Sequence, residues 1–111
     1  MRFQSILLLL LVLLASATMN QALPRWTPVK DITNTHYLKM VHFAVNDYGN
    51  KTGQTLEFEK LINVEGQSYN DGTNFRLTLA AKNRLISHKY EAVVWEPGFG
   101  GAWVVTSFQR A

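Results

Sequence analysis

Three histidines and no cysteine limit the chemistry open to this chain of 111 residues. Without cysteine there is neither a thiolate nucleophile nor a disulfide. His36 and His42 are six residues apart, so a helix would point them to different faces, and they would not form a two-ligand metal pair. The serines lack the spacing of a nucleophile elbow. We therefore expect no enzyme, no catalytic residue, no metal site and no cofactor.

Neither phosphate nor nucleic acid is an expected ligand. The glycine-rich segment "GFGG", residues 98–101, lies between two expected strands, whereas a phosphate-binding loop opens a helix. The formal net charge is +3, from 11 basic and 8 acidic residues. Removal of an amino-terminal leader that contains Arg2 would leave 10 basic and 8 acidic residues. The lysines are scattered along the chain, which indicates a solvated surface rather than a nucleic-acid interface.

Residues 1–22 are predicted to be a secretory signal peptide. The apolar run Ile6–Leu14 follows a short basic start, and it is too short to span a bilayer. Ala15-Ser16-Ala17 has the small-x-small pattern of a signal peptidase site, and cleavage after Ala22 is the other option. Residues 23–111 then form one small domain. We expect a secreted protein on an extracellular, apoplast or vacuolar route, without a membrane anchor.

One helix is predicted near the start of this domain. Thr33 or Asn34 can cap it, it should continue to about Tyr48, and Gly49 and Gly53 should end it. Apolar residues at helical spacing form a stripe that must be buried against another element. The expected stripe consists of Leu38, Val41, Val45 and Tyr48, widened by Phe43 and Ala44.

Everything after the helix has the pattern of β-strands. Apolar and polar residues alternate in four runs, separated by segments rich in turn residues. The expected strands cover residues 56–64, 75–81, 90–95 and 104–108. In the first strand Leu56, Phe58, Ile62 and Val64 should face inward, with Lys60 breaking the pattern. The order predicts an α+β domain with one helix packed across a four- to five-stranded antiparallel sheet.

An antiparallel meander would bring three connecting segments to one end of the sheet. The loops at 66–72 and 96–102 both follow odd-numbered strands, so they should lie together, with the loop at 83–88 at the other end. The proline-containing arm at 23–28 can reach the first end, with Trp26 as its anchor on the body. The sequence therefore predicts one edge made of two loops and an arm.

The first of these loops poses a question of its own. Asp71-Gly72 before an alternating strand is a strong hairpin signal, with Gly72 expected at positive φ. A turn built only to reverse the chain has no need of Tyr69. Either Tyr69 folds back on the core or the tip contacts another molecule.

Several segments resemble plant cystatins over nearly all of residues 24–110. "MVHFAVNDYG", from Met40 to Gly49, is similar to their helix signature L-A-R-F-A-V-x-E-Y-N. "GTNFRLTLAAK" resembles their second strand, "KYEAVVWE" their third and "TSF" their last, and "RWTPVKDI" resembles their lead from arm to helix. A secretion signal without cysteines also fits the plant type. The resemblance implies a cystatin-like fold.

The resemblance further implies a reversible inhibitor of papain-like cysteine proteases. In this family the arm and both hairpin loops form a wedge that fills the active-site cleft and covers the catalytic cysteine without bonding to it. Tyr69 would then lie at the tip because the tip enters a cleft. The implied protease-binding residues are Pro24, Arg25, Gln67, Ser68, Tyr69, Asn70, Asp71, Gly72, Gly98 and Phe99.

The same segments depart from the family pattern. The family's first loop is Q-x-V-x-G; matching Gly72 to its glycine puts Ser68 at the glutamine and Asn70 at the valine, and matching Gln67 instead needs one extra residue. The family's second loop is W-E-K-P-W, and here Gly98 stands at its proline and Phe99 at its last tryptophan. In the arm, Pro24-Arg25 replaces Gly-Gly.

Two interpretations follow from these departures. One is a cystatin that inhibits, with changed strength or selectivity. The other is a cystatin-fold protein without tight inhibition that serves as a secreted binding module. In both we expect a monomer. Asn50-Lys51-Thr52 is an N-glycosylation sequon, so Asn50 is a candidate glycan site.

Export gives the first testable prediction. We expect the mature protein to begin at Thr18 or Leu23, because peptidase cleavage should follow Ala17 or Ala22. Amino-terminal sequencing of protein secreted from plant cells checks this. Intact Met1 on mature intracellular protein would contradict it.

Overall fold

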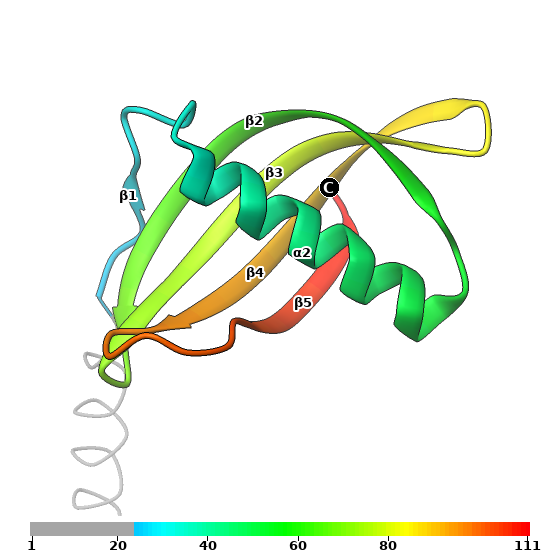
Figure 1. The fold of residues 1–111 in the computed structure, drawn as a ribbon. Helices are drawn as coiled ribbons and strands as arrows, with labels where there is room; N and C mark the ends of the chain where they lie inside the picture. The colour runs from blue at the N-terminus through cyan, green and yellow to red at the C-terminus, as the bar shows by residue number, and fades with distance from the viewer. Residues whose placement is uncertain (1–23) are drawn as a thin grey trace, which may run out of the picture.

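A single helix lies across one face of a five-stranded antiparallel sheet in the computed structural model, which describes residues 24–111 (Figure 1). The strands follow one another in the sheet in chain order, so the expected meander and α+β class are confirmed. The fifth strand is formed by the last residues of the arm. The elements are β1 (Thr27–Pro28), α2 (Thr35–Thr52), β2 (Leu56–Tyr69), β3 (Gly72–Asn83), β4 (Ile86–Pro97) and β5 (Val104–Arg110).

Capping residues set the two ends of α2. Asn34 is the N-cap, and its side-chain oxygen accepts a hydrogen bond from the backbone N–H of His36 at 3.0 Å. The helix was expected to end near Tyr48, and this was wrong, because it runs through Gly49 to Thr52. Gly53 ends it, since it takes a left-handed conformation (φ 73°) and its N–H bonds to the Gly49 carbonyl.

The turn before the helix is held by Asp31. Its carboxylate accepts hydrogen bonds from the hydroxyl and the backbone N–H of Thr33. These bonds favour the charged form and hold the pKa of Asp31 below its ordinary value. The polar turn thus leads the chain from β1 into the helix.

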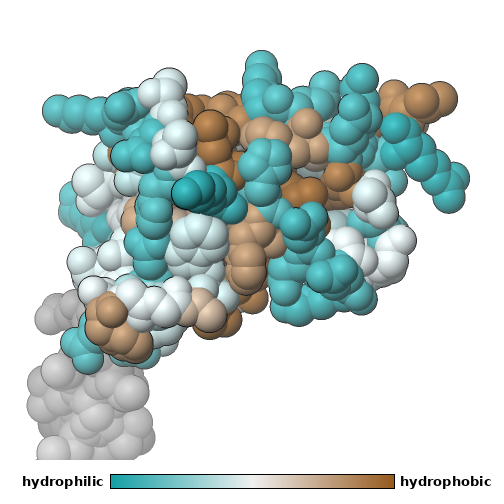
Figure 2. Space-filling view, in the orientation of Figure 1, coloured by the Kyte–Doolittle hydropathy of each residue, from teal (hydrophilic) through white to brown (hydrophobic). Residues whose placement is uncertain are grey.

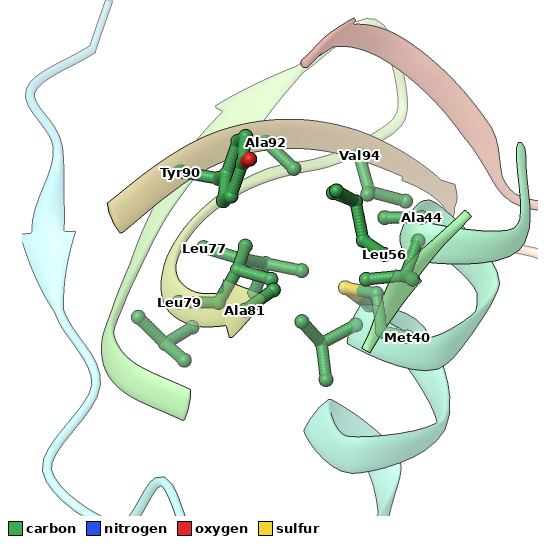
Figure 3. Packing of buried hydrophobic residues seen from close by; sticks show 12 residues of the cluster. Met40, Ala44, Leu56, Leu77, Leu79, Ala81, Tyr90, Ala92 and Val94 are labelled. Atoms are coloured by element: carbon green, nitrogen blue, oxygen red, sulfur yellow. The ribbon is translucent and has the colours of Figure 1, made fainter. Parts of the chain in front are cut away.

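The core lies between α2 and the facing side of the sheet (Figure 3). Val41 and Val45 are buried as expected, and Met40 and Ala44 are buried completely beside them. The expected stripe was too wide. Leu38 and Tyr48 are only half-buried, and Phe43 is 37% exposed, because the sheet covers only the middle of the helix face. From the sheet, the core takes Leu56, Val64, Leu77, Leu79, Ala81, Tyr90, Ala92 and Val94.

Two irregularities in β2 explain why its pattern breaks at Lys60. The register with β3 shifts between Phe58 and Lys60 and again between Leu61 and Asn63. Each shift adds a residue to β2, so the inward positions change phase along the strand. As a result Leu61 packs against the core where Ile62 was expected. Bulges of this kind let a long strand bend around the helix.

The connections fall at two ends of the sheet, as the meander requires. The β2–β3 turn, the β4–β5 loop and the arm lie at one end, at the lower left of Figure 1. The β3–β4 turn at the other end is formed by Arg84 and Leu85, with Arg84 at φ 61°. Within residues 24–111, no helix has the length and apolar character needed to cross a bilayer.

Burial of the helix face gives the second prediction. Val45→Ala should lower the free energy of unfolding by about 1–2 kcal/mol, because it removes buried methyl groups and leaves a small cavity. Lys51→Ala should cost about 0.5 kcal/mol or less, since it breaks only an exposed i,i+4 ion pair with Asp47. Urea unfolding of both variants measures the difference. Equal losses would contradict the assigned helix face.

Candidate functional site

Three segments that are distant in sequence form one end of the sheet, here called the three-part edge. It consists of the arm at residues 24–26, the β2–β3 turn with its flanks at 67–73, and the β4–β5 loop at 98–103 (Figure 1). A shallow open depression joins the arm to both hairpins. It is lined by Pro24, Ser68, Tyr69, Asn70, Asp71, Gly72, Thr73 and Gly98.

The structure therefore brings most of the implied binding residues together. Seven of these ten residues line the depression. Arg25 and Gln67 lie beside it, in a second hollow between the arm and β2. Phe99 stands apart on the β4–β5 loop and is 84% exposed. Its ring is therefore not tucked under its own loop.

The first hairpin is tighter than expected. The strands continue to Tyr69 and resume at Gly72, so the turn consists of Asn70 and Asp71 alone and not of a loop from 66 to 72. Both turn residues have positive φ, 45° and 59°. This is the backbone of a two-residue hairpin turn, and Asn and Asp are the non-glycine residues that best tolerate it. The expectation of positive φ at Gly72 was wrong.

Gly72 and Gly98 serve a different purpose, which is close packing of the two hairpins. A Cβ on Gly72 would clash with the carbonyl oxygen of Glu96, and a Cβ on Gly98 would lie 2.5 Å from the carbonyl oxygen of Asp71. The backbones are near enough for the N–H of Gly98 to donate a hydrogen bond to that Asp71 oxygen at 2.9 Å. The tips of the two hairpins are therefore joined through their main chains.

Trp95 makes a second link between the hairpins. Its indole Nε1–H donates to the carbonyl oxygen of Tyr69 at 2.9 Å. The indole packs against Gly72, where a Cβ would come within 2.9–3.0 Å of ring atoms. The ring can reach Tyr69 only because Gly72 has no side chain. No pattern in the sequence gives a sign of this bond.

The arm is fixed to the same hairpin. Gln67 Nε2 donates to the carbonyl oxygen of Pro24 at 2.8 Å, and β1 pairs with β2 in the register Thr27 to Gly66. The guanidinium of Arg76 lies 4.5 Å from the centre of the Trp26 ring, which confirms Trp26 as an anchor on the body. Arg76 is itself held by two hydrogen bonds to a carboxylate oxygen of Glu65.

A polar cluster that sequence reasoning missed supports the β4–β5 loop. His36 Nε2 and Trp103 Nε1 approach the same carboxylate oxygen, Oε2 of Glu96, at 2.7 and 2.6 Å. The Trp103 ring also packs edge-on against Phe43, with 5.6 Å between ring centres. The carboxyl-terminal end of the loop, at Trp103, is therefore attached to the helix. No local pattern reveals a contact that joins three elements.

Among residues 24–111, no three His, Asp or Glu side chains converge as metal ligands. Asn50 is exposed in the last turn of α2, and Figure 1 shows this end of the helix far from the three-part edge. What the edge offers chemically is a surface of peptide groups, small residues and exposed aromatic rings. Such a surface can bind by contact.

Comparison with known proteins places the chain in a family. Its sequence is 32% identical over 108 residues to "Cysteine proteinase inhibitor 5" of Arabidopsis thaliana, an alignment that covers 96% of this chain and 86% of the relative. The chain belongs to the plant cystatin family. A second plant cystatin, "Cysteine proteinase inhibitor 1" of Actinidia chinensis var. chinensis, is 30% identical over 77% of this chain and 72% of its own length.

Two further comparisons add to this assignment. The family model SQAPI, described as "Aspartic acid proteinase inhibitor", matches residues 29–111. Among solved structures, the salivary cystatin from the soft tick Ornithodoros moubata superimposes with a TM-score of 0.67, covering 79% of this chain and 97% of the tick protein. At 20% identity the tick structure shows that the two proteins share a fold.

Close packing at the three-part edge gives the third prediction. Gly72→Ala should destabilise the protein by about 1–3 kcal/mol, because the new methyl group overlaps the Glu96 carbonyl and the Trp95 ring. Gly66→Ala is the matched control, since a Cβ there meets only ordinary contacts at 3.6 Å or more. Thermal unfolding compares the two cystatin variants. A larger loss for Gly66→Ala would show that the hairpins do not pack as described.

Proposed function

We propose that this cystatin is a reversible inhibitor of papain-like cysteine proteases, blocking the active-site cleft with its arm and two hairpins. Membership of the plant cystatin family and the names of its relatives support protease inhibition. The observation that carries the proposal is the construction of the three-part edge. Hydrogen bonds join the arm to β2 and the first hairpin to the second, so three segments form one contact surface.

A preformed surface is what an inhibitor without covalent chemistry requires. Binding costs the conformational freedom of every loop that becomes ordered, and a surface that is already rigid avoids much of that cost. The main-chain bond between Gly98 and Asp71 and the bond from Trp95 to Tyr69 provide the rigidity. In the proposed mode the inhibitor forms no covalent bond with the protease, so inhibition is reversible and depends on contact alone.

Departures from the family pattern change the polarity of the surface that would meet the protease. Asn70 has φ 45°, which a β-branched residue such as valine adopts only at considerable cost, so this turn suits the residues it contains. The resulting tip is polar and carries the carboxylate of Asp71. Phe99 supplies the apolar contact of the second loop, and Figure 2 shows brown surface at that end of the molecule. Weaker or more selective inhibition follows from this combination.

A second target class has its own support. The matching family model carries the description aspartic acid proteinase inhibitor, and the polar tip departs from the apolar loop of plant cystatins that target cysteine proteases. Inhibition of a pepsin-like aspartic proteinase without inhibition of papain would favour this class. Absence of both activities would favour the non-inhibitory binding module.

We also propose where the inhibitor acts, on the basis of its predicted signal peptide. A secreted monomer would meet proteases on the extracellular, apoplast or vacuolar route. A glycan on Asn50 would leave the contact surface free, because this residue lies at the end of α2 remote from the edge.

The second loop gives the fourth prediction. Phe99→Ala should weaken inhibition of papain by about 10- to 100-fold, the loss expected when a buried aromatic contact is removed. Its melting temperature should stay unchanged, since the ring is 84% exposed in the free protein. Phe99→Trp, which restores the residue typical of the family, should retain or strengthen inhibition.

The matched control is Leu85→Ala. Leu85 is 93% exposed at the opposite end of the sheet, so its loss should change neither inhibition nor stability. Inhibition constants for papain measure all three variants. Equal inhibition by Phe99→Ala and the wild type would exclude the second loop from the contact.

A further inference from the structure

The sheet face opposite α2, here called the open sheet face, carries a hollow next to the three-part edge. It is lined by Tyr69, Asn70, Asn74, Trp95, Val104 and Thr106. The strand register explains the grouping. Gln67, Asn74, Trp95 and Val104 form one cross-strand row, and core residues occupy the rows that face the helix.

The register also answers the question of Tyr69. Phe75 pairs with Gly66 and packs against the core, so Tyr69, three positions after Gly66, points to the open sheet face. Its side chain does not fold back on the core and stays 43% exposed. Val104 across the hollow is 48% exposed. Two apolar side chains thus flank Trp95 on a face that no other described element covers.

The floor of the hollow is already ordered. The Trp95 indole is held by its bond to the Tyr69 carbonyl and by packing on Gly72. A partner that binds here does not lose free energy in ordering the Trp95 ring. Trp and Tyr are also among the residue types that most often dominate the binding energy of an interface.

The chemistry of the lining defines what fits. All six lining residues are uncharged. The nearest charged row holds Glu65 and Arg76, which bond to one another. The Asn74 amide makes only a long hydrogen bond, 3.5 Å, to Gln67. An uncharged apolar side chain, on a segment whose peptide groups can bond to Asn74 and Thr106, suits this surface.

We propose that the hollow receives an apolar side chain from the protease surface just outside the active-site cleft, so that the inhibitory contact extends from the tips onto the open sheet face. The proposal rests on the function proposed above. Continuity selects this occupant, because Tyr69 and Asn70 line both this hollow and the depression of the three-part edge. A protease that holds the tips must place the wall of its cleft beside these two residues.

Val104→Lys tests the proposal, with papain as the probe. A lysine there puts a charge into the hollow, while β5 keeps its hydrogen bonds because the side chain is exposed. We expect the inhibition constant to rise at least tenfold with an unchanged melting temperature, and Val104→Ile to inhibit like the wild type. Thr106→Arg, on the same wall and also exposed, should act like Val104→Lys and replaces it if that variant unfolds.

The controls separate this inference from the proposed function. Leu85→Lys adds the same charge at the far end and should inhibit like the wild type. If Phe99→Ala weakens inhibition while Val104→Lys and Thr106→Arg do not, the inference is overturned and the inhibitor function stands. A wild-type protein that does not inhibit papain overturns both. Self-association in sedimentation velocity that Val104→Lys abolishes would assign the hollow to a second copy of the chain and overturn the inference.

Discussion

The close packing of the main chains of two hairpins is the constraint on which the three-part edge and its proposed contact surface depend. Gly72 and Gly98 let the hairpins approach until Gly98 bonds to the Asp71 carbonyl, and any side chain at either position would separate them. Trp95 reaches the Tyr69 carbonyl only because Gly72 leaves room for its ring. The tip, the second loop and the hollow on the open sheet face are therefore consequences of one close approach. In a chain without disulfides, this approach replaces a covalent link between the two hairpins.

The sheet holds the hairpins in position, and the helix gives the sheet its shape. Bulges near Lys60 and Ile62 let β2 bend around α2 while Val64 and Leu61 remain inward. Toward the edge the same face changes from apolar to polar, and Glu96 there lies against His36 Nε2 and accepts a hydrogen bond from Trp103. The side of the sheet nearest the helix thus supports the β4–β5 loop, and the opposite side supports the β2–β3 turn through Trp95. Each hairpin has its own support, and the glycine contact couples them.

Local patterns predicted the elements well because each pattern depends on neighbouring residues. Periodicity identified α2 and all four long strands, and the order of the loops predicted which connections share an end of the sheet. The errors occurred where distant residues decide. Gly72 follows Asp71 like an ordinary turn glycine, yet its role depends on Glu96 and Trp95, more than twenty positions later. The end of α2 is a smaller error, because both Gly49 and Gly53 were expected to end the helix and only Gly53 has the left-handed backbone of a cap. The bulges in β2 and the bonds to Glu96 are likewise set by tertiary packing.

Parts of the proposed contact surface differ in how many bonds hold them, and this difference bears on which targets the surface can accept. The first hairpin is fixed by a two-residue turn, by Trp95 and by the bond to Gly98, so its polar tip cannot rearrange to suit an apolar cleft. Phe99 is different, because glycines at 100 and 101 follow it and its ring has almost no contact with the body. A partner must therefore match the shape and polarity of the first hairpin as it stands, whereas the second loop can adjust its aromatic ring to the surface it meets. Selectivity in this cystatin should accordingly be set at Asn70 and Asp71, and affinity should be gained at Phe99.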